Sequence, residues 1–213
     1  MNRSASRRIW DISQTLRPGL PVWPGDTAFQ FERSWRMEDG SPVNVGRMTM
    51  STHSGTHADA PLHYAAAGAD AASLDLEPYL GECLLVDARG AAGRKVEVGD
   101  LPPLDGAKRV LLRTYDPFPQ EEWRSDFTAI APETIRWLAG QGVRLIGTDA
   151  PSLDPQDSKD LAAHKAVLAA DMRILEGLVL DGVPPGRYEL IALPLKIANG
   201  DAGLCRAVLR ELA

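Results

Sequence analysis

The chain has 213 residues, of which 44% are hydrophobic and 24% charged, and its formal net charge at pH 7 is −6. This length fits a single domain that buries a sizeable core, and no segment has the composition of a linker. The negative charge and the scattered Lys and Arg residues argue against nucleic acid or an anionic membrane as the main partner, and no apolar run is long enough to span a bilayer or to act as a signal sequence.

The first segment, residues 1–8, is basic and is expected to be a flexible tail that precedes one domain over residues 9–213. Within this domain, short apolar or alternating runs predict strands. In chain order the predicted strands are Ile9–Leu16, Phe29–Trp35, Val43–Thr52, Cys83–Ala88, Arg109–Thr114, Leu145–Thr148, Leu175–Leu180, Tyr188–Leu195 and Ala207–Leu212. We expect these strands to form a sheet that curls towards a barrel.

Two helices are predicted among these strands. The first, Pro132–Ala139, starts with proline and is followed by Gly140, and it separates two apolar strands as in a βαβ crossover. The second, Ser158–Met172, is rich in Ala, Leu and Lys, and Ser158 is its expected N-cap. The expected fold class is therefore mixed α/β (α+β), a single strand-rich domain with helices flanking a barrel-like sheet.

The two cysteines, Cys83 and Cys205, are far apart in the sequence, and each stands among apolar residues. We expect a cytoplasmic protein, and because the cytosol disfavours disulfides, both cysteines should be buried free thiols. Neither has a histidine near it in the sequence, and the chain has no G-x-S-x-G nucleophile elbow and no glycine-rich phosphate loop after a strand. Serine- and cysteine-based acyl transfer therefore have little support.

Histidine is concentrated in one short segment. The chain has four histidines, and three of them, His53, His57 and His63, stand close together with Asp59 among them. Three imidazoles and a carboxylate form a ligand set that zinc prefers, at about 2.0–2.2 Å. A single histidine on an apolar face is more often a hydrogen-bonded core residue, but three with an aspartate between them favour a metal site.

The residues between these histidines favour a compact turn over a helix. Gly55 permits backbone angles that a side chain would forbid. Pro61 lacks an amide hydrogen and biases Ala60 away from the helical region. The H-E-x-x-H pattern of helical zinc sites is absent. We expect a turn that gathers the ligands.

Another pair of candidate ligands follows later in the chain. His164 falls in the middle of the second predicted helix, and Glu176 lies in the apolar run Ile174–Leu180. An ionised carboxylate is costly to bury without a partner, and a metal ion would be such a partner. From the cost of burial alone, a buried ion pair or exposure on an edge strand explains Glu176 equally well.

The histidine segment resembles the signature of the cyclase family of metal-dependent hydrolases, H-x-G-T-H-x-D-x-P-x-H, and residues 53–63 match every defining position. The resemblance covers nearly the whole chain, and the N-terminal part looks like the opening of the bacterial kynurenine formamidase branch. The other matching segments are Trp10–Leu16, Val22–Asp26, Gly147–Ser152, His164 with Ile174–Leu178, and Leu193–Lys196. The resemblance implies a swivelling β/β/α fold and a homodimer.

For the site, the resemblance implies two divalent metal ions, with zinc expected and Mn²⁺ or Co²⁺ as alternatives. His53 and His57 would bind the first ion and His164 and Glu176 the second, with Asp59 as the bridge. Two such ions, about 3.5–4 Å apart, would activate a shared water as hydroxide.

His63 then has a different expected role, because His53, His57 and Asp59 already supply three ligands to one ion. An imidazole with an unperturbed pKa near ~6.5 suits general acid/base catalysis at physiological pH. We therefore expect His63 to be the catalytic proton carrier.

Trp23 is the candidate substrate-binding residue. It stands in the turn-rich segment Pro21–Gly25, where its ring could line a pocket mouth, although a tryptophan that closes the core fits equally well. In the kynurenine formamidases, the tryptophan at this position contacts the aryl ring of the substrate. The reaction implied by the resemblance is hydrolysis of N-formyl-L-kynurenine to L-kynurenine and formate, a step of tryptophan breakdown, by a metal-activated hydroxide, with His63 protonating the departing aniline nitrogen.

Two alternatives stay open. The family also includes lactam hydrolases such as those that open isatin, and a polyketide cyclase activity is historical to its name. Outside enzymes, the metals could be structural in a non-catalytic binding module. A structural zinc site is normally closed and rich in thiolates, whereas this set consists of histidine and carboxylate, which favours an enzyme.

Overall fold

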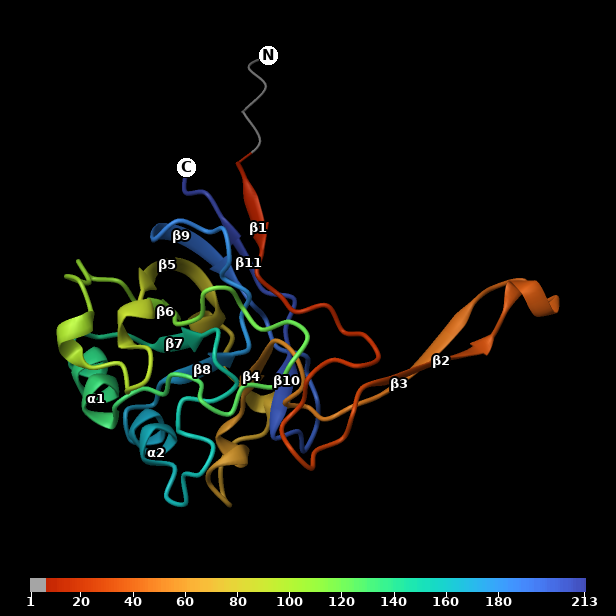
Figure 1. Ribbon diagram of the computed structural model, residues 1–213, viewed down its shortest axis with the longest axis horizontal. Coiled ribbons are helices and arrows are strands. Elements are labelled where there is room, and N and C mark those ends of the chain that lie inside the picture. Colours follow the sequence, from red (N-terminus) through yellow and green to blue (C-terminus); the bar gives the residue numbers. More distant parts are fainter. Residues whose placement is uncertain (1–6) are drawn as a thin grey trace, which may run out of the picture.

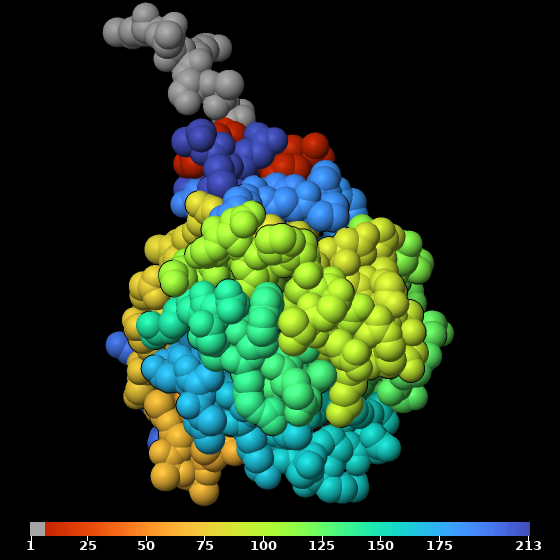
Figure 2. Space-filling view, turned by 90° about the vertical axis from the view of Figure 1, so that its left-hand side faces the viewer, coloured from red at the N-terminus to blue at the C-terminus, as the bar shows by residue number. Residues whose placement is uncertain are grey.

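The computed structural model describes residues 7–213, so most of the predicted tail, residues 1–6, lies outside the described residues. The guanidinium of Arg8 lies over the ring of Trp10, 4.6 Å from its centroid. The first strand β1 (Ile9–Asp11) pairs with the last strand β11 (Val208–Arg210). Figure 2 shows the result, with the two ends of the chain, red and dark blue, together at one pole of the body.

A nine-stranded mixed sheet forms the body of the molecule (Figure 1). Its strand order is β1-β11-β9-β5-β6-β7-β8-β4-β10. The remaining strands are β4 (His57–Asp59), β5 (Leu80–Asp87), β6 (Arg109–Arg113), β7 (Leu145–Thr148), β8 (Arg173–Glu176), β9 (Gly186–Ile191) and β10 (Ala202–Leu204). The four central strands β5 to β8 are parallel, and the outer strands are antiparallel. The sheet curls strongly into half a barrel, which confirms the prediction of a mixed α/β domain with a barrel-like sheet.

Two helices cover one face of the central strands. Helix α1 (Pro132–Gly140) connects β6 to β7, and α2 (Ala162–Ala169) connects β7 to β8, so both are crossovers between parallel strands, as predicted for α1. Because side chains alternate along a strand, Val110 packs with the helices while its neighbour Leu111 belongs to the core on the other face. The central strands are thus buried on both faces, which explains their continuous apolar runs.

Helix α2 is shorter than predicted, and its expected cap is wrong. It begins at Ala162 because Leu161 adopts left-handed angles (φ 49°, ψ 51°), which end the helix on its N-terminal side. The first-turn amides of Ala163 and His164 donate to the carboxylate of Asp154, at 2.9 and 3.0 Å. The hydroxyl of Ser158 accepts a hydrogen bond from the amide of Leu161, which precedes the helix, and donates one to the carboxylate of Asp160.

Strand ends also differ from the predictions, because pairing sets them. Strand β8 runs beside β7 and spans Arg173 to Glu176, so it starts two residues and ends four residues before the predicted Leu175–Leu180. The predicted compact turn covers only the residues before His57, because His57–Asp59 form β4 between β8 and β10. The sequence does not predict β4 or β10, each of which has three residues.

A separate two-stranded ribbon extends away from the body (Figure 1). It consists of β2 (Gln30–Trp35) and β3 (Val45–Thr49), both predicted, and every residue of the two strands is exposed. We call residues 30–49 the arm. Among the described residues, no helix has the length and apolar character needed to cross a membrane.

Candidate active site

The pairing of β4 with β8 places three of the predicted ligands on one face of the sheet. His57 lies opposite Glu176, and Ala58 lies opposite Leu175. Ala58 and Leu175 belong to the core cluster on one face. Because side chains alternate, His57, Asp59 and Glu176 point to the other face, the one that α2 covers.

The remaining predicted ligands converge on Asp59 from other elements. His164, on α2, has its Nε2 3.3 Å from Oδ2 of Asp59 and 3.7 Å from Oε1 of Glu176. His53, in the turn before β4, has its Nδ1 3.2 Å from Oδ1 of Asp59, and Nε2 of His57 lies 3.4 Å from the same oxygen. All five residues predicted as ligands therefore lie together. Exposure of Glu176 on an edge strand, one of its two alternative explanations, is wrong, since β8 is an inner strand and Glu176 is 3% exposed.

The polar atoms at the centre of this cluster fit a bound metal ion. Both carboxylate oxygens of Asp59 and Nε2 of His57 are buried, and none of the three has a hydrogen-bond partner within the described part of the chain. Leaving a buried carboxylate unpaired is costly, whereas a cation would satisfy all three atoms. His53, His57 and Asp59 each offer one ligand atom within 4.8 Å of the others. The donor set is the nitrogen and oxygen set that divalent transition metals prefer.

Electrostatics in the cluster favour positive charge. Burial alone would lower the pKa of His57, but the carboxylates of Asp59 and Glu176 raise this pKa to about 10. Burial also opposes charge on His164, whose pKa is raised to about 10 by Asp154 and Asp59. Although burial would raise the pKa of Asp59, the surrounding histidines hold it well below its usual range. Protons or a metal ion can supply the positive charge that the buried carboxylates require.

Two glycines allow the turn and the end of β8 to approach each other. Gly55 has φ +71° and Gly177 has φ +64°, and a Cβ on Gly177 would lie 2.5 Å from the carbonyl oxygen of Gly55. The hydroxyl of Thr56 donates to the carbonyl of Gly177 at 2.7 Å. This close contact fixes the segment that carries His53 and His57 against the strand that carries Glu176, and Gly55 takes the special backbone angles expected of it.

His63 lies in the 3-10 turn Pro61–His63, at the edge of the cluster. His63 is partly exposed, and the centroid of its ring lies 4.1 Å from that of His53 and 6.0 Å from that of His164. Burial of part of the ring lowers the pKa of His63, although the carboxylate of Asp59 opposes this. His63 also offers a ligand atom within 4.8 Å of atoms from Asp59 and His164. Its position therefore suits proton transfer but also permits ligation.

The cluster opens into a pocket of about 560 Å³ with aromatic walls. Trp23 lines this pocket and contacts Trp123 edge to face, with ring centroids 5.4 Å apart. Neither core cluster includes Trp23, although its ring centroid lies 6.1 Å from that of the buried Phe127. Trp123 and Phe118 also line the pocket but are not among the residues predicted from the sequence. The one signal for Trp123 is a large aromatic residue within the charged run Glu121–Arg124.

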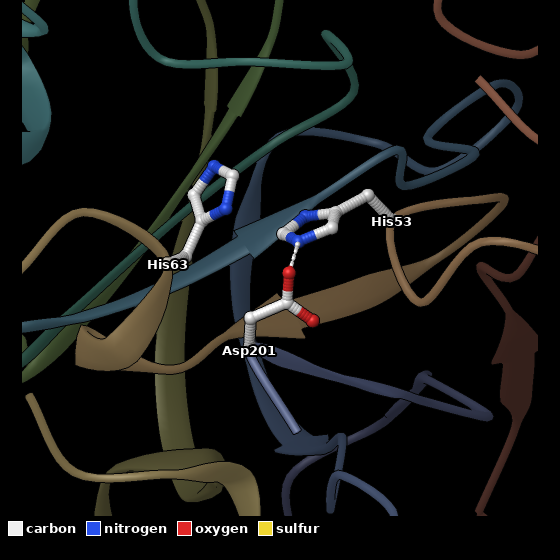
Figure 3. A group of neighbouring side chains, drawn as sticks. All are labelled: His53, His63 and Asp201. Carbon is white, nitrogen blue, oxygen red and sulfur yellow. Dashed lines mark hydrogen bonds and ion pairs between the residues drawn. The ribbon is translucent and has the colours of Figure 1, made fainter. Parts of the chain in front are cut away.

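Three histidines of the cluster have a partner on the ring nitrogen that faces away from Asp59. Nδ1 of His57 donates to the carbonyl of Gly55 at 3.0 Å, and Nδ1 of His164 donates to Asp154 at 2.6 Å. Nε2 of His53 lies 3.2 Å from a carboxylate oxygen of Asp201, as Figure 3 shows. Asp154 and Asp201 are not predicted from the sequence, because no motif connects them to the histidines.

Comparison with known proteins agrees with this geometry. Residues 10–155 match the model of the Cyclase family, described as "Putative cyclase". The chain is 73% identical to a kynurenine formamidase of Erythrobacter litoralis (strain HTCC2594) over 98% of its length and 96% of the relative, and 61% identical to one of Sphingopyxis alaskensis over 97% and 99%. A solved structure titled as a potential metal-dependent hydrolase with cyclase activity superposes with a TM-score of 0.83, at 29% identity, covering 98% of this chain and 100% of the other. The chain therefore belongs to the cyclase family, in its kynurenine formamidase branch.

Proposed function

We propose that this protein is an enzyme that hydrolyses N-formyl-L-kynurenine to L-kynurenine and formate. The observation that carries the proposal is the buried cluster around Asp59 at the base of an aromatic pocket, in a chain that is 73% identical to a kynurenine formamidase. The histidines and Glu176 in the lining suit the polar formyl group, and the aromatic lining residues suit an aryl ring. The reaction belongs to the breakdown of tryptophan.

The proposed cofactor is a pair of divalent metal ions, with zinc expected and Mn²⁺ or Co²⁺ as alternatives. The two oxygens of Asp59 support a pair: Oδ1 faces His53 and His57, and Oδ2 faces His164. Asp59 would bridge, and Glu176 would join His164 at the second position. When bound, such ions lower the pKa of a water molecule and polarise a carbonyl group.

In this reaction His63 carries the proton. The lowered pKa of His63 leaves its ring neutral at pH 7, so it can accept a proton from the attacking water. The water oxygen forms a bond to the formyl carbon, and the carbon–nitrogen bond then breaks. His63 returns the proton to the aniline nitrogen, which leaves as the amine of L-kynurenine, and the other product is formate.

The test of this function is an activity assay of purified protein with N-formyl-L-kynurenine, before and after treatment of the protein with a chelator. We expect turnover that the chelator removes and added Zn²⁺ restores, with metal-depleted protein still folded by circular dichroism. Isatin is the comparison substrate, because a lactam hydrolase would open its ring faster. Faster turnover of isatin, or none of either substrate, would refute the proposal.

Trp23→Ala is expected to raise KM for formylkynurenine more than it lowers kcat. The reason is that an aryl contact is present in the ground state as well as in the transition state. Trp23 is half-buried and packs on Trp123, so the thermal midpoint should fall only slightly. Steady-state kinetics checks the effect; an unchanged KM together with a lower melting temperature would mean that Trp23 only supports the fold.

The arm supports a proposed homodimer. It carries a set of exposed large apolar residues, namely Phe31, Trp35, Met37, Val43, Val45 and Met48. A two-stranded ribbon is at best marginally stable alone in water, and an exposed apolar patch of this kind marks a protein interface. The arm also carries both charge signs, with Arg47 paired to Glu32, so a second copy is a suitable partner. Analytical ultracentrifugation should give the mass of a dimer, and a monomer would contradict this.

We also propose that the protein is cytoplasmic. Its proposed partner is a small-molecule substrate, and we expect it to bind neither nucleic acid nor a membrane. Cys83 and Cys205 are both buried and free, which suits a reducing compartment. The net charge of −6 opposes binding to polyanions.

A further inference from the structure

We propose that Asp201 is a positioning residue that holds the ring of His53 with Nδ1 towards Asp59, and so sets the metal affinity of the position formed by His53, His57 and Asp59. This inference rests on the proposed metal site, but it does not depend on which substrate the enzyme hydrolyses.

His53 needs such a partner more than the other two histidines do. His57 is fixed by strand β4 and His164 by helix α2, whereas His53 lies in an irregular turn and its side chain is 20% exposed. A free imidazole in a turn can rotate about its side-chain bonds, and ordering it costs free energy each time a metal binds. A fixed acceptor beside the ring reduces that cost.

The two nitrogens of His53 face two different carboxylates. Nδ1 lies 3.2 Å from Oδ1 of Asp59. Nε2 lies 3.2 Å from Oδ2 of Asp201, the contact drawn in Figure 3. The Asp201 carboxylate, when ionised, can only accept a hydrogen bond, so the proton of the neutral ring is held on Nε2. The lone pair then stays on Nδ1, the atom directed at Asp59 and at the proposed ion.

Asp201 is itself held in place by three independent contacts. Its Oδ1 accepts a hydrogen bond from the hydroxyl of Thr52 at 2.7 Å. Its backbone carbonyl accepts one from the amide of Ala60 at 2.9 Å. The next residue, Ala202, is the partner of Asp59 in the β4–β10 ladder. Asp201 is therefore fixed against both the turn that carries His53 and the strand that carries Asp59.

The same arrangement recurs on the opposite side of the cluster. Nδ1 of His164 donates to Asp154, which is anchored in turn by the amides of Ala163 and His164. Carboxylates of this kind orient ligand histidines, and removing one typically weakens metal binding 10–100-fold. Asp201 and Asp154 thus contact different histidines, Asp154 as a buried carboxylate at 2.6 Å and Asp201 as a 46% exposed one at 3.2 Å, and each serves as the control for the other.

An alternative is that His53, His63 and Asp201 themselves hold an ion, since their ligand atoms lie within 4.8 Å of one another. An ion there would use Nε2 of His53 and compete with the hydrogen bond to Asp201. It would also leave unsatisfied the buried oxygens of Asp59, which need a cation most. The hydrogen-bonded arrangement is therefore favoured, and metal stoichiometry separates the two.

The test measures zinc affinity directly, by competition between metal-free protein and a chromophoric chelator. Asp201→Asn keeps the shape and the contact with Thr52 but presents an amide donor to Nε2, which drives the ring proton to Nδ1. We expect the affinity of one zinc equivalent to fall 10–100-fold and that of the other to stay unchanged. Asp154→Asn should have the complementary effect, and adding it to Asp201→Asn should weaken both equivalents.

Variants built on His53→Ala show whether Asp201 affects zinc affinity through His53. In His53→Ala, the added Asp201→Asn should change zinc affinity no further, whereas the added Asp154→Asn should still weaken it. Wild-type zinc affinity in Asp201→Asn, or an equal loss in the His53→Ala background, would overturn the proposal. The proposal would also be overturned if the wild type bound a third zinc equivalent that Asp201→Asn lost, because Asp201 would then be a ligand. Zinc binding without turnover of formylkynurenine would instead overturn the proposed function alone.

Discussion

Asp59→Asn is expected to remove activity together with metal. The wild-type protein should carry up to two divalent ions per chain, and the variant should retain fewer than one, because both oxygens of Asp59 face candidate ligand sets. Asparagine offers one neutral oxygen in place of two that share a negative charge, and its amide would point N–H groups at the same region. Elemental analysis of purified protein gives the metal content, and the formylkynurenine assay gives the activity.

A suitable control is Asp75→Asn, which makes the same chemical change at an exposed carboxylate that accepts a hydrogen bond from the amide of Glu77. It should leave metal content and kcat at wild-type values. Activity in metal-free Asp59→Asn equal to that of the wild type would end the metal-based account. Retention of one full ion with the loss of the other would show that Asp59 serves one position and does not bridge.

The candidate site was largely predictable because its central part is local in sequence. His53, His57, Asp59 and His63 fall within one motif, and Gly55 marks the turn that gathers them. From the sequence alone, Glu176 could be a metal ligand, a member of a buried ion pair or an exposed residue on an edge strand. Its place opposite His57 depends on antiparallel pairing between two strands more than one hundred residues apart, and no local pattern specifies that register.

The outer residues of the site could not be predicted for the same reason. Asp201 reaches His53 only because β10 pairs with β4, and both strands are too short to give a period-two signal. The predicted N-terminal end of α2 is wrong because Asp154, from the preceding loop, accepts hydrogen bonds from the first-turn amides for which Ser158 is the expected cap. Two central strands with continuous apolar runs agree much better with the predictions: β7 matches Leu145–Thr148 without change, and β6 ends one residue before the predicted Thr114.

His63→Ala gives the sharpest separation of the two roles that its position allows. If His63 carries the proton, kcat should fall by about 10²–10⁴-fold, which corresponds to about 3–5 kcal/mol of barrier, while metal content stays at the wild-type value. His63 is partly exposed and its ring lies at the edge of the cluster, so its removal should not disturb the fold. Steady-state kinetics and elemental analysis on the same preparation measure both quantities.

The pH profile adds an independent readout. Partial burial lowers the pKa of His63 below its usual 6.5. The neutral, proton-accepting ring predominates at every pH above this lowered pKa. Activity of the wild type should therefore rise with pH through this pKa and then level off, and His63→Ala should lack that limb because the titrating group is gone. A variant that loses one equivalent of metal in parallel with its activity would instead identify His63 as a ligand beside Asp59 and His164, a grouping that the distances also permit. The proton would then have to come from another group in the pocket.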